Sequence, residues 1–489
     1  MFGKGGLPLR GEQGDGGPER GARRESGVSL AWALAMKKTA RCTTKEKRAS
    51  KPKDAGDAKY GFVEKAALTV GALLLVVFTI IGMEFTLHGS HLSRMQGVGR
   101  AAPAVGDSLF SRTMEMFTGT HMTDGNHVTV LFNGEQTYPA IWKELRGAKQ
   151  TITMQMYYFE PGKIADTLSA ILRERARSGV SVQLLTDAFG AQKITRGYLD
   201  TLAAAGVHTA IFRPVHWYEM QKLQNRSHIR AVIVDGRVGF TGGFGIADKW
   251  LGNGHTKDQW RDTDVRFTGP AVSQLQATFA DGWVEATGTL LTGEKYFPKE
   301  PVKEEPSETA GLLDAQPTIG STPAERFLAL SIAGARKRLY IANSYFVPNH
   351  DFKNLLIQAA HRGVDVRILT VGPETDVKIT RYAGRKQYDD LLKGGVRIWE
   401  FAPTMMHAKT IVADGMWASV GTMNFDNRSM VFNDESNLNV LDASTGALLD
   451  SVFLNDLEYS KEVTRAEFAK RGLWQRLCEL GASAMARLL

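Results

Sequence analysis

Two stretches of the chain share one alternation of apolar and polar positions. They are residues 228–236, HIRAVIVDG, and residues 407–415, HAKTIVADG. A period of two residues predicts a β-strand, and the Asp-Gly pair at the end of each stretch predicts a turn. Residues two apart on a strand share a face. We therefore predict two equivalent strands, each of which presents a histidine and a cationic side chain on the same side.

The two stretches belong to a longer internal repeat. Asp235 follows His228 by seven positions, as Asp414 follows His407, and a glycine stands 14 positions after each histidine. Three further pairs of similar segments keep the same order: residues 158–161 and 345–348, 177–180 and 361–364, and 205–207 and 394–396. We interpret the chain as two fused copies of one α/β unit.

Predicted strands alternate with helical segments through both copies. This order predicts a mostly parallel sheet covered on both faces. As a fold class we expect two repeats, each a mixed sheet with helices on both faces. The first repeat is assigned to residues 125–294 and the second to residues 318–489. Residues 295–317 contain four prolines and a cluster of Lys and Glu, so we predict an interdomain linker there.

The N-terminal region differs from the repeats. We predict a disordered basic tail at residues 1–62, a transmembrane anchor at residues 63–87 and a connector at residues 88–124. The anchor rests on an uncharged run at residues 66–83, AALTVGALLLVVFTIIGM, whose length is near the lower limit for a bilayer span. A buried core helix is disfavoured because the run has no polar face. A cleaved signal peptide is disfavoured by the long basic region before it.

Charge is distributed unevenly along the chain. The formal net charge is +8, and residues 1–65 contain 15 Lys or Arg and 8 Asp or Glu, so seven of the eight net charges lie in this segment. The nearly neutral repeats argue against a nucleic-acid groove. The positive-inside rule places the tail in the cytoplasm and the repeats on the other side of the membrane. The two cysteines, Cys42 and Cys478, would then be unable to form a disulfide.

Several motifs resemble those of the phospholipase D superfamily and, within it, of the bacterial cardiolipin synthases. The two His-x-Lys/Arg-x4-Asp stretches carry most of the resemblance. Four further segments add to it: 239–243 (GFTGG), 260–266 (WRDTDVR), 343–348 (NSYFVP) and 421–426 (GTMNFD). The similarity extends over about residues 120–442.

The resemblance implies a membrane-anchored phosphatidyltransferase of the bacterial inner membrane. Its reaction would join two phosphatidylglycerol molecules into cardiolipin and release glycerol, through a phosphatidyl-histidine intermediate. The partners implied are a phospholipid substrate and the membrane. Enough cationic side chains are present that we expect no metal and no other cofactor.

The same resemblance assigns roles to individual residues. His228 would attack the phosphorus and His407 would protonate the leaving alcohol, although the sequence leaves open which histidine attacks first. Phosphoryl oxygens would be bound by Arg230, Lys409 and Asn424. The catalytic motifs also contain the aspartates Asp235 and Asp414, which stand beside glycines at strand ends and are expected to hold the motif rather than perform the chemistry.

Each catalytic histidine needs a partner on Nδ1 that fixes its tautomer. The resemblance suggests a carboxylate downstream in the same repeat. Asp262 stands downstream of His228 in the first repeat, and Glu435 stands downstream of His407 in the second. We predict that these two carboxylates orient the catalytic imidazoles.

The first repeat departs from the family pattern at three positions. Arg230 stands in place of Lys, Gly245 in place of the Asn expected in register with Asn424, and Asp264 in place of His. An arginine is a planar fork rather than a point charge, and glycine supplies no side-chain donor. Two alternatives therefore remain open: a phospholipase D-type hydrolase of phospholipids, and a catalytically impaired scaffold that retains the fold.

Overall fold

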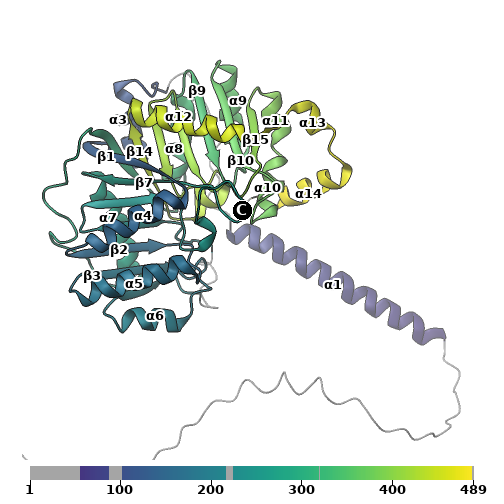
Figure 1. Ribbon diagram of the computed structural model, residues 1–489. Coiled ribbons are helices and arrows are strands. Elements are labelled where there is room, and N and C mark those ends of the chain that lie inside the picture. The colour runs from purple at the N-terminus through teal and green to yellow at the C-terminus, as the bar shows by residue number, and fades with distance from the viewer. Residues whose placement is uncertain (1–54, 88–101, 216–223, 319, 487–489) are drawn as a thin grey trace, which may run out of the picture. The chain divides into compact units, whose positions relative to one another are not determined.

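The structure is a computed structural model that describes residues 55–87, 102–215, 224–318 and 320–486 (Figure 1). The chain divides into an N-terminal unit that ends at Val76 and a main unit that begins at Val77. The predicted disordered tail lies outside the described residues up to position 54, and the remaining part of it, residues 55–62, belongs to a helix.

That helix is α1 (Ala55–Leu87). It contains the apolar run of residues 66–83, of which the side chains of residues 80–83 lie outside those described. Among the described residues, which include side chains of α1 only at positions 61 and 64–79, no helix is long and apolar enough to cross a membrane.

The first repeat is built on seven strands. Their order across the sheet is β1-β7-β6-β5-β2-β3-β4. Strands β2, β3 and β4 are parallel, and the other neighbours are antiparallel. The strands are β1 (Thr123–Phe132), β2 (Thr151–Met156), β3 (Ser181–Asp187), β4 (His208–Phe212), β5 (Arg230–Val234), β6 (Val238–Gly242) and β7 (Thr263–Thr268).

The second repeat has the same strand order. Its sheet runs β8-β14-β13-β12-β9-β10-β11, with β15 added at the edge. The strands are β8 (Glu308–Ala315), β9 (Arg338–Asn343), β10 (Asp365–Val371), β11 (Arg397–Phe401), β12 (Lys409–Ala413), β13 (Trp417–Gly421), β14 (Glu435–Leu441) and β15 (Ser460–Glu462). Antiparallel pairing of β1 with β8 joins the two repeats into one run of strands. The repeat predicted from sequence spacing is confirmed.

Two details of the predicted organisation differ from the structure. The segment predicted as a linker, residues 295–317, contains β8, which pairs with β14 along its length. Its apolar side chains Leu312 and Leu313 are buried, but the flanking prolines and charges conceal the strand pattern. The sheet is also less parallel than the βα alternation suggests, because β5, β6 and β7 follow one another as antiparallel neighbours.

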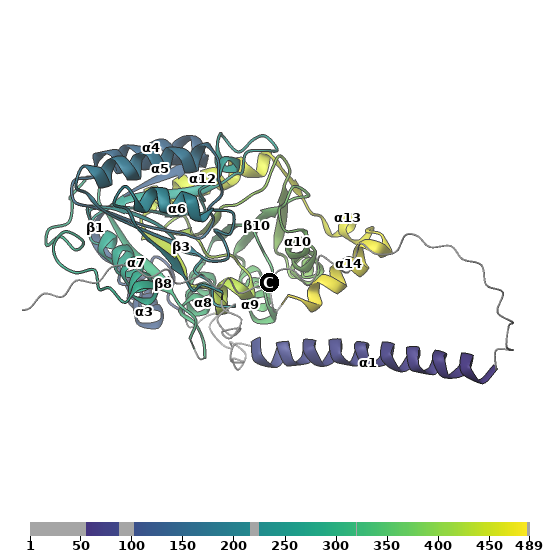
Figure 2. The same ribbon diagram turned by 90° about the horizontal axis from the view of Figure 1, so that it is seen from below.

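Helices cover both faces of each sheet (Figures 1 and 2). Side chains of α4 and α5 share a core with β2 and β3 on one face, and side chains of α7 share a core with β5 on the other. In the second repeat α8 and α9 pack on one face, while α12 contributes Phe453 to a core on the other side. The helices are α4 (Asn133–Gly147), α5 (Lys163–Arg177), α6 (Arg196–Ala203), α7 (Ala271–Thr287), α8 (Pro323–Gly334), α9 (His350–His361), α10 (Lys378–Arg385), α11 (Tyr388–Lys393), α12 (Ala443–Glu458), α13 (Arg465–Ala469) and α14 (Leu473–Ala484).

The predicted connector, residues 88–124, is partly structured. Its residues 88–101 lie outside the described ranges, whereas residues 108–118 form helix α3 (Ser108–Thr118). Phe110 of α3 is buried and meets the ring of Trp417 edge to face, with ring centroids 5.0 Å apart. The described end of the connector therefore belongs to the core of the second repeat.

Candidate active site

The two histidines precede equivalent strands. His228 lies two residues before Arg230, the first residue of β5, and His407 lies two residues before Lys409, the first residue of β12. Each strand is flanked by neighbours on both sides within its sheet, and all four side chains are buried. The strand predicted from the alternation is confirmed in both repeats, as is the tight turn that follows it, where the aspartate and glycine have positive φ.

Each imidazole is paired with a carboxylate through Nδ1. Nδ1 of His228 lies 2.9 and 3.0 Å from the two carboxylate oxygens of Glu435. Nδ1 of His407 lies 2.8 Å from Oδ2 of Asp262. Both carboxylates were predicted as partners, but sequence spacing assigned each to the histidine of its own repeat. In the structure each carboxylate instead pairs with the histidine of the other repeat. Glu435 of the second repeat binds His228, and Asp262 of the first repeat binds His407.

Short backbone bridges between the repeats produce this exchange. The N–H of His228 donates to the carbonyl of Asp434, at 2.9 Å, and the N–H of His407 donates to the carbonyl of Arg261, at 2.7 Å. Each carboxylate residue directly follows a bridging residue. Neither half can therefore assemble a complete histidine–carboxylate pair alone.

A cationic side chain faces the other nitrogen of each ring. Lys409 Nζ lies 3.0 Å from Nε2 of His407, and Arg230 Nη1 lies 3.2 Å from Nε2 of His228. Lys409 also donates to Oγ of Ser344, at 2.8 Å. Each positive charge also affects the histidine of the other repeat: Lys409 lowers the pKa of His228, and Arg230 lowers the pKa of His407. The four side chains therefore form one electrostatic centre.

Burial sets the protonation of the imidazoles. Desolvation lowers the pKa of His228 to about 4, and it lowers the pKa of His407 well below its ordinary value of 6.5. Both rings are thus neutral at neutral pH. With Nδ1–H donating to a carboxylate, the lone pair sits on Nε2, which is the form that a nucleophile or a general base requires.

The carboxylates are ionised despite their burial. Desolvation alone would raise the pKa of Asp262, but His407, Lys409 and a hydrogen bond from Trp250 lower it to about 2. His228 and Thr422 likewise lower the pKa of Glu435 against desolvation. Desolvation lowers the pKa of Lys409 to about 7, so this side chain can exchange a proton near neutral pH.

The two aspartates of the motifs lie at the other ends of their strands. Asp235 accepts the backbone N–H groups of Lys149, Gln150 and Thr151 at 2.7 to 2.8 Å. Asp414 accepts three N–H groups of residues 336–338 at 2.7 to 2.9 Å. These contacts tie each hairpin to the loop before the neighbouring strand. They agree with the expectation that the aspartates hold the motif.

The departure at Gly245 is accommodated by Trp250. The indole of this buried residue fills the space beside Gly245, where an added Cβ would lie 2.8 Å from the ring. Its Nε1–H donates to Oδ2 of Asp262, at 2.8 Å, and its ring meets His407 edge to face, with centroids 5.1 Å apart. In the second repeat Thr422 donates to Glu435 instead. Sequence reasoning missed Trp250, although a glycine in place of a side chain indicates that a neighbour takes the space.

The other predicted positions are also buried near this centre. Asn424 is buried, and its Oδ1 has no hydrogen-bond partner among the described residues. Asp264 accepts from Thr137 Oγ1, at 2.6 Å. Desolvation and the adjacent charge of Asp262 raise the pKa of Asp264 well above its usual range. A neutral Asp264 avoids placing a second negative charge beside Asp262.

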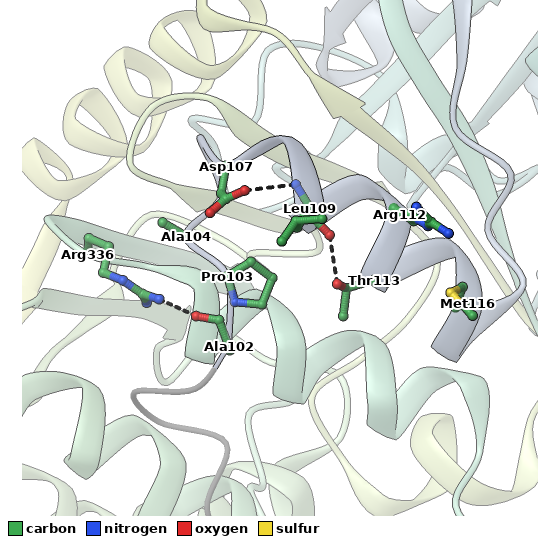
Figure 3. Close-up of a pocket in the computed structure, with 9 residues that line it drawn as sticks. All are labelled: Ala102, Pro103, Ala104, Asp107, Leu109, Arg112, Thr113, Met116 and Arg336. Carbon is green, nitrogen blue, oxygen red and sulfur yellow. Dashed lines mark hydrogen bonds between the residues drawn. The ribbon is translucent and has the colours of Figure 1, made fainter.

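Two hollows in the described surface lie elsewhere. One of about 860 Å³ lies over α3 and is lined by Leu109, Arg112, Met116 and Arg336, among others (Figure 3). The other, of about 270 Å³, is lined by residues that include Arg213 and Glu285. Neither is lined by His228 or His407. Within the described ranges no three His, Cys, Asp or Glu side chains are grouped so as to hold a metal ion.

Known proteins resemble this chain over both repeats. The family described as "Cardiolipin synthase, PLD-like domain" matches residues 141–283 and 328–457. Cardiolipin synthase of Geobacillus thermodenitrificans is 33% identical over 365 residues, which cover 74% of this chain and 72% of that protein. Cardiolipin synthase 2 of Bacillus anthracis is 34% identical over 382 residues, covering 78% and 74%.

A solved structure supports the fold. The phosphatidylserine synthase of Haemophilus influenzae aligns with a TM-score of 0.57 at 14% identity, over 78% of this chain and 97% of that one. The doubled motif, the duplicated sheet and the sequence matches agree with one another. The chain belongs to the cardiolipin synthase family with phospholipase D-like domains, and it is a phosphatidyltransferase of the phospholipase D type.

Proposed function

We propose that the protein makes cardiolipin from two molecules of phosphatidylglycerol and releases glycerol. The observation that carries the proposal is the pair of crossed histidine–carboxylate contacts, His228 with Glu435 and His407 with Asp262. Two neutral imidazoles with lone pairs on Nε2, beside two cations, provide a nucleophile, a proton carrier and charge stabilisation for a phosphodiester. The names of the relatives support cardiolipin as the product.

In the first step, Nε2 of His228 attacks the phosphorus of one phosphatidylglycerol. A nitrogen–phosphorus bond forms, the bond to the glycerol oxygen breaks, and His407 donates a proton to that oxygen. The proton is available because the anionic phosphodiester favours the protonated form of a buried imidazole. Lys409 has a pKa of about 7, and its Nζ lies 3.0 Å from Nε2 of His407, so it can pass a proton to that nitrogen.

In the second step, the free glycerol hydroxyl of another phosphatidylglycerol attacks the phosphatidyl-histidine. His407 takes the hydroxyl proton, the nitrogen–phosphorus bond breaks, and cardiolipin leaves. Arg230, Lys409 and Asn424 would bind the phosphoryl oxygens during both steps. Oδ1 of buried Asn424 has no partner among the described residues, so the amide can turn its NH₂ group to the phosphate without breaking a hydrogen bond at its oxygen.

Product analysis tests the proposal. The full chain is incubated with phosphatidylglycerol vesicles labelled in the headgroup glycerol, and the lipids are extracted. We expect cardiolipin and one free glycerol for each cardiolipin formed. Phosphatidic acid as the main lipid product would identify a hydrolase instead, because water would then have reached the intermediate.

Matched variants separate an enzyme from a scaffold. His228→Ala and His407→Ala are each expected to abolish product formation. As a control, His361→Ala changes a histidine at the end of α9, remote in sequence from both motifs, and should leave the product yield unchanged. A parent protein that forms neither product, while it remains folded, would support the catalytically impaired scaffold.

We also propose that residues 66–83 anchor the protein in the bacterial inner membrane, with the N-terminus in the cytoplasm. Support comes from the uncharged run at these positions, the basic segment before it and the phospholipid substrate class. Leu74→Lys combined with Val77→Lys should release the protein from membranes during an alkaline wash, whereas the parent stays bound. Release of the parent would contradict the anchor.

A further inference from the structure

Helix α14 (Leu473–Ala484) has the reverse polarity of an ordinary surface helix. Leu473 and Trp474 are 79% and 78% exposed, and Leu477 and Leu480 are also exposed. Residues 473, 477, 480 and 484 follow helical spacing, and residues 474, 481 and 485 lie beside them. This outward arc contains no charged residue. Large apolar side chains on one continuous exposed face indicate a partner surface.

The inward face of the helix carries the polar contacts. Buried Glu479 is paired with Arg471 at 2.8 Å and with Arg385 of α10 at 3.3 Å. Near the end of the helix, Ala482 packs in a small cluster with Val347 and Ala383. Ion pairs and small residues therefore hold α14 on the protein. Its leucines and its tryptophan take little part in folding.

A positive side chain borders the apolar arc. Arg476 of α14 is exposed and precedes Leu477 directly. An apolar face of Leu and Trp with Lys or Arg at its edge is typical of helices that lie in the interface of an anionic bilayer. Trp favours that interface because its ring is apolar while its N–H needs a polar partner. The charge complements anionic phospholipid.

The helix is connected to the catalytic centre. It packs along α10 (Lys378–Arg385), and Figures 1 and 2 draw the two helices side by side. Helix α10 begins two residues after Asp376, which accepts a hydrogen bond from the hydroxyl of Tyr345, at 2.8 Å. Asp376 is also one of the groups whose charge acts on Lys409. A surface bound by α14 would thus contact the candidate active site through α10 and Asp376, on the side where Lys409 lies.

We propose that α14 is a membrane-docking helix that inserts its apolar arc into an anionic phospholipid surface. The docking is separate from the anchor at residues 66–83 and from any step of the proposed reaction. It orients the repeats on the bilayer, so that the lipid substrate is met at a fixed side of the protein. A second copy of the chain is the competing occupant of the same arc.

Fluorescence quenching in vesicles tests the docking. The full chain carries Cys42→Ser and Cys478→Ser, and one new cysteine, Leu477→Cys, is labelled with a polarity-sensitive dye. The matched control places the cysteine at Leu290, which is 74% exposed in a loop after α7. In vesicles of phosphatidylcholine and phosphatidylglycerol with brominated chains, we expect at least threefold stronger quenching at 477 than at 290. Equal quenching at both positions would overturn the proposal. So would dye self-quenching at 477 in detergent without lipid, because it would show two copies meeting there.

A second experiment measures what docking does. Leu473→Ser, Leu477→Ser and Leu480→Ser are combined in the full chain, and two exposed leucines of α12, Leu448 and Leu454, are changed to Ser as a control. We expect the first variant alone to raise the KM for vesicle phosphatidylglycerol at least tenfold, with kcat on a soluble short-chain analogue unchanged. An unchanged KM would contradict docking. A parent without activity would refute the proposed reaction, while the quenching result would still decide the docking.

Discussion

Replacing Glu435 by Gln removes one negative charge from the His228 pair and keeps the shape of the side chain. The carboxylate lies 2.9 Å from Nδ1 of His228 and is fully buried. When Nε2 of His228 bonds to phosphorus, the ring becomes positively charged, and the carboxylate stabilises that charge. A neutral amide can still accept the hydrogen bond, but it cannot supply the ionic part of the interaction.

The expected loss follows from Coulomb's law. Two unit charges about 4 Å apart, roughly the distance from the carboxylate to the middle of the ring, interact by about 4 kcal/mol at an effective dielectric constant of about 20. Removal of that stabilisation from the transition state lowers kcat by about a thousandfold. KM should change little, because the ring is neutral until the phosphorus is attacked.

The assay is cardiolipin formation from phosphatidylglycerol by Glu435→Gln, with thermal unfolding as the check of folding. The matched control is Glu308→Gln, which changes a buried glutamate at the β1–β8 junction that accepts the N–H of Val128. The control should keep kcat within about threefold of the parent. A folded Glu435→Gln protein whose kcat lies within tenfold of the parent would refute the role given to this carboxylate.

The same contacts give three further predictions. Trp250→Phe keeps an aromatic ring but removes the N–H donated to Asp262. The free energy of unfolding in urea should fall by about 1–3 kcal/mol. An unchanged value would show that this hydrogen bond does not stabilise the fold. Asp414→Asn should lower stability by a similar amount while the folded enzyme keeps kcat within about threefold, and loss of activity without loss of stability would instead make Asp414 catalytic. Lys409 has a pKa of about 7 in the folded chain, below its ordinary 10.5. Between pH 7 and 10.5 the unfolded chain therefore binds one more proton than the folded chain. The free energy of unfolding then rises by about 1.4 kcal/mol per pH unit. Lys409→Met should lack this rise between pH 7 and 9 in urea unfolding, and a parallel rise in both proteins would contradict it.

Much of the fold could be predicted from local sequence patterns. The alternation around His228 and His407 predicts β5 and β12, and the repeated spacing within the chain predicts the duplication. The reasoning does not predict strand β8, because the prolines and glutamates that precede it in the sequence are typical of a linker. Only the pairing with β14 and β1, strands distant in sequence, makes residues 308–315 a strand.

The pairing of each histidine with a carboxylate of the other repeat could not be predicted from the sequence. Both histidines and both cations follow from the motifs, and both carboxylates follow from the family resemblance. The pairing does not, because His228 and Glu435 are 207 residues apart and His407 and Asp262 are 145 apart. Spacing within one repeat favours the nearer carboxylate, whereas the bridges between repeats decide the actual partner.

The polarity of α14 could be predicted only in part. Its sequence shows an amphipathic helix, and the usual expectation is that the apolar side faces the core. The buried ion pair of Glu479 with Arg385 reverses that orientation. An interaction of this kind depends on two helices that are far apart in the sequence, so no local pattern contains it.

The central claim is that one phosphorus atom is handled by two imidazoles, one from each repeat. Rapid quenching of the full chain with phosphatidylglycerol labelled at phosphorus, followed by peptide mapping under alkaline conditions, tests it most directly. The account predicts label on the peptide that contains His228, and loss of that label in His228→Ala. Turnover without label on either His228 or His407 would contradict it.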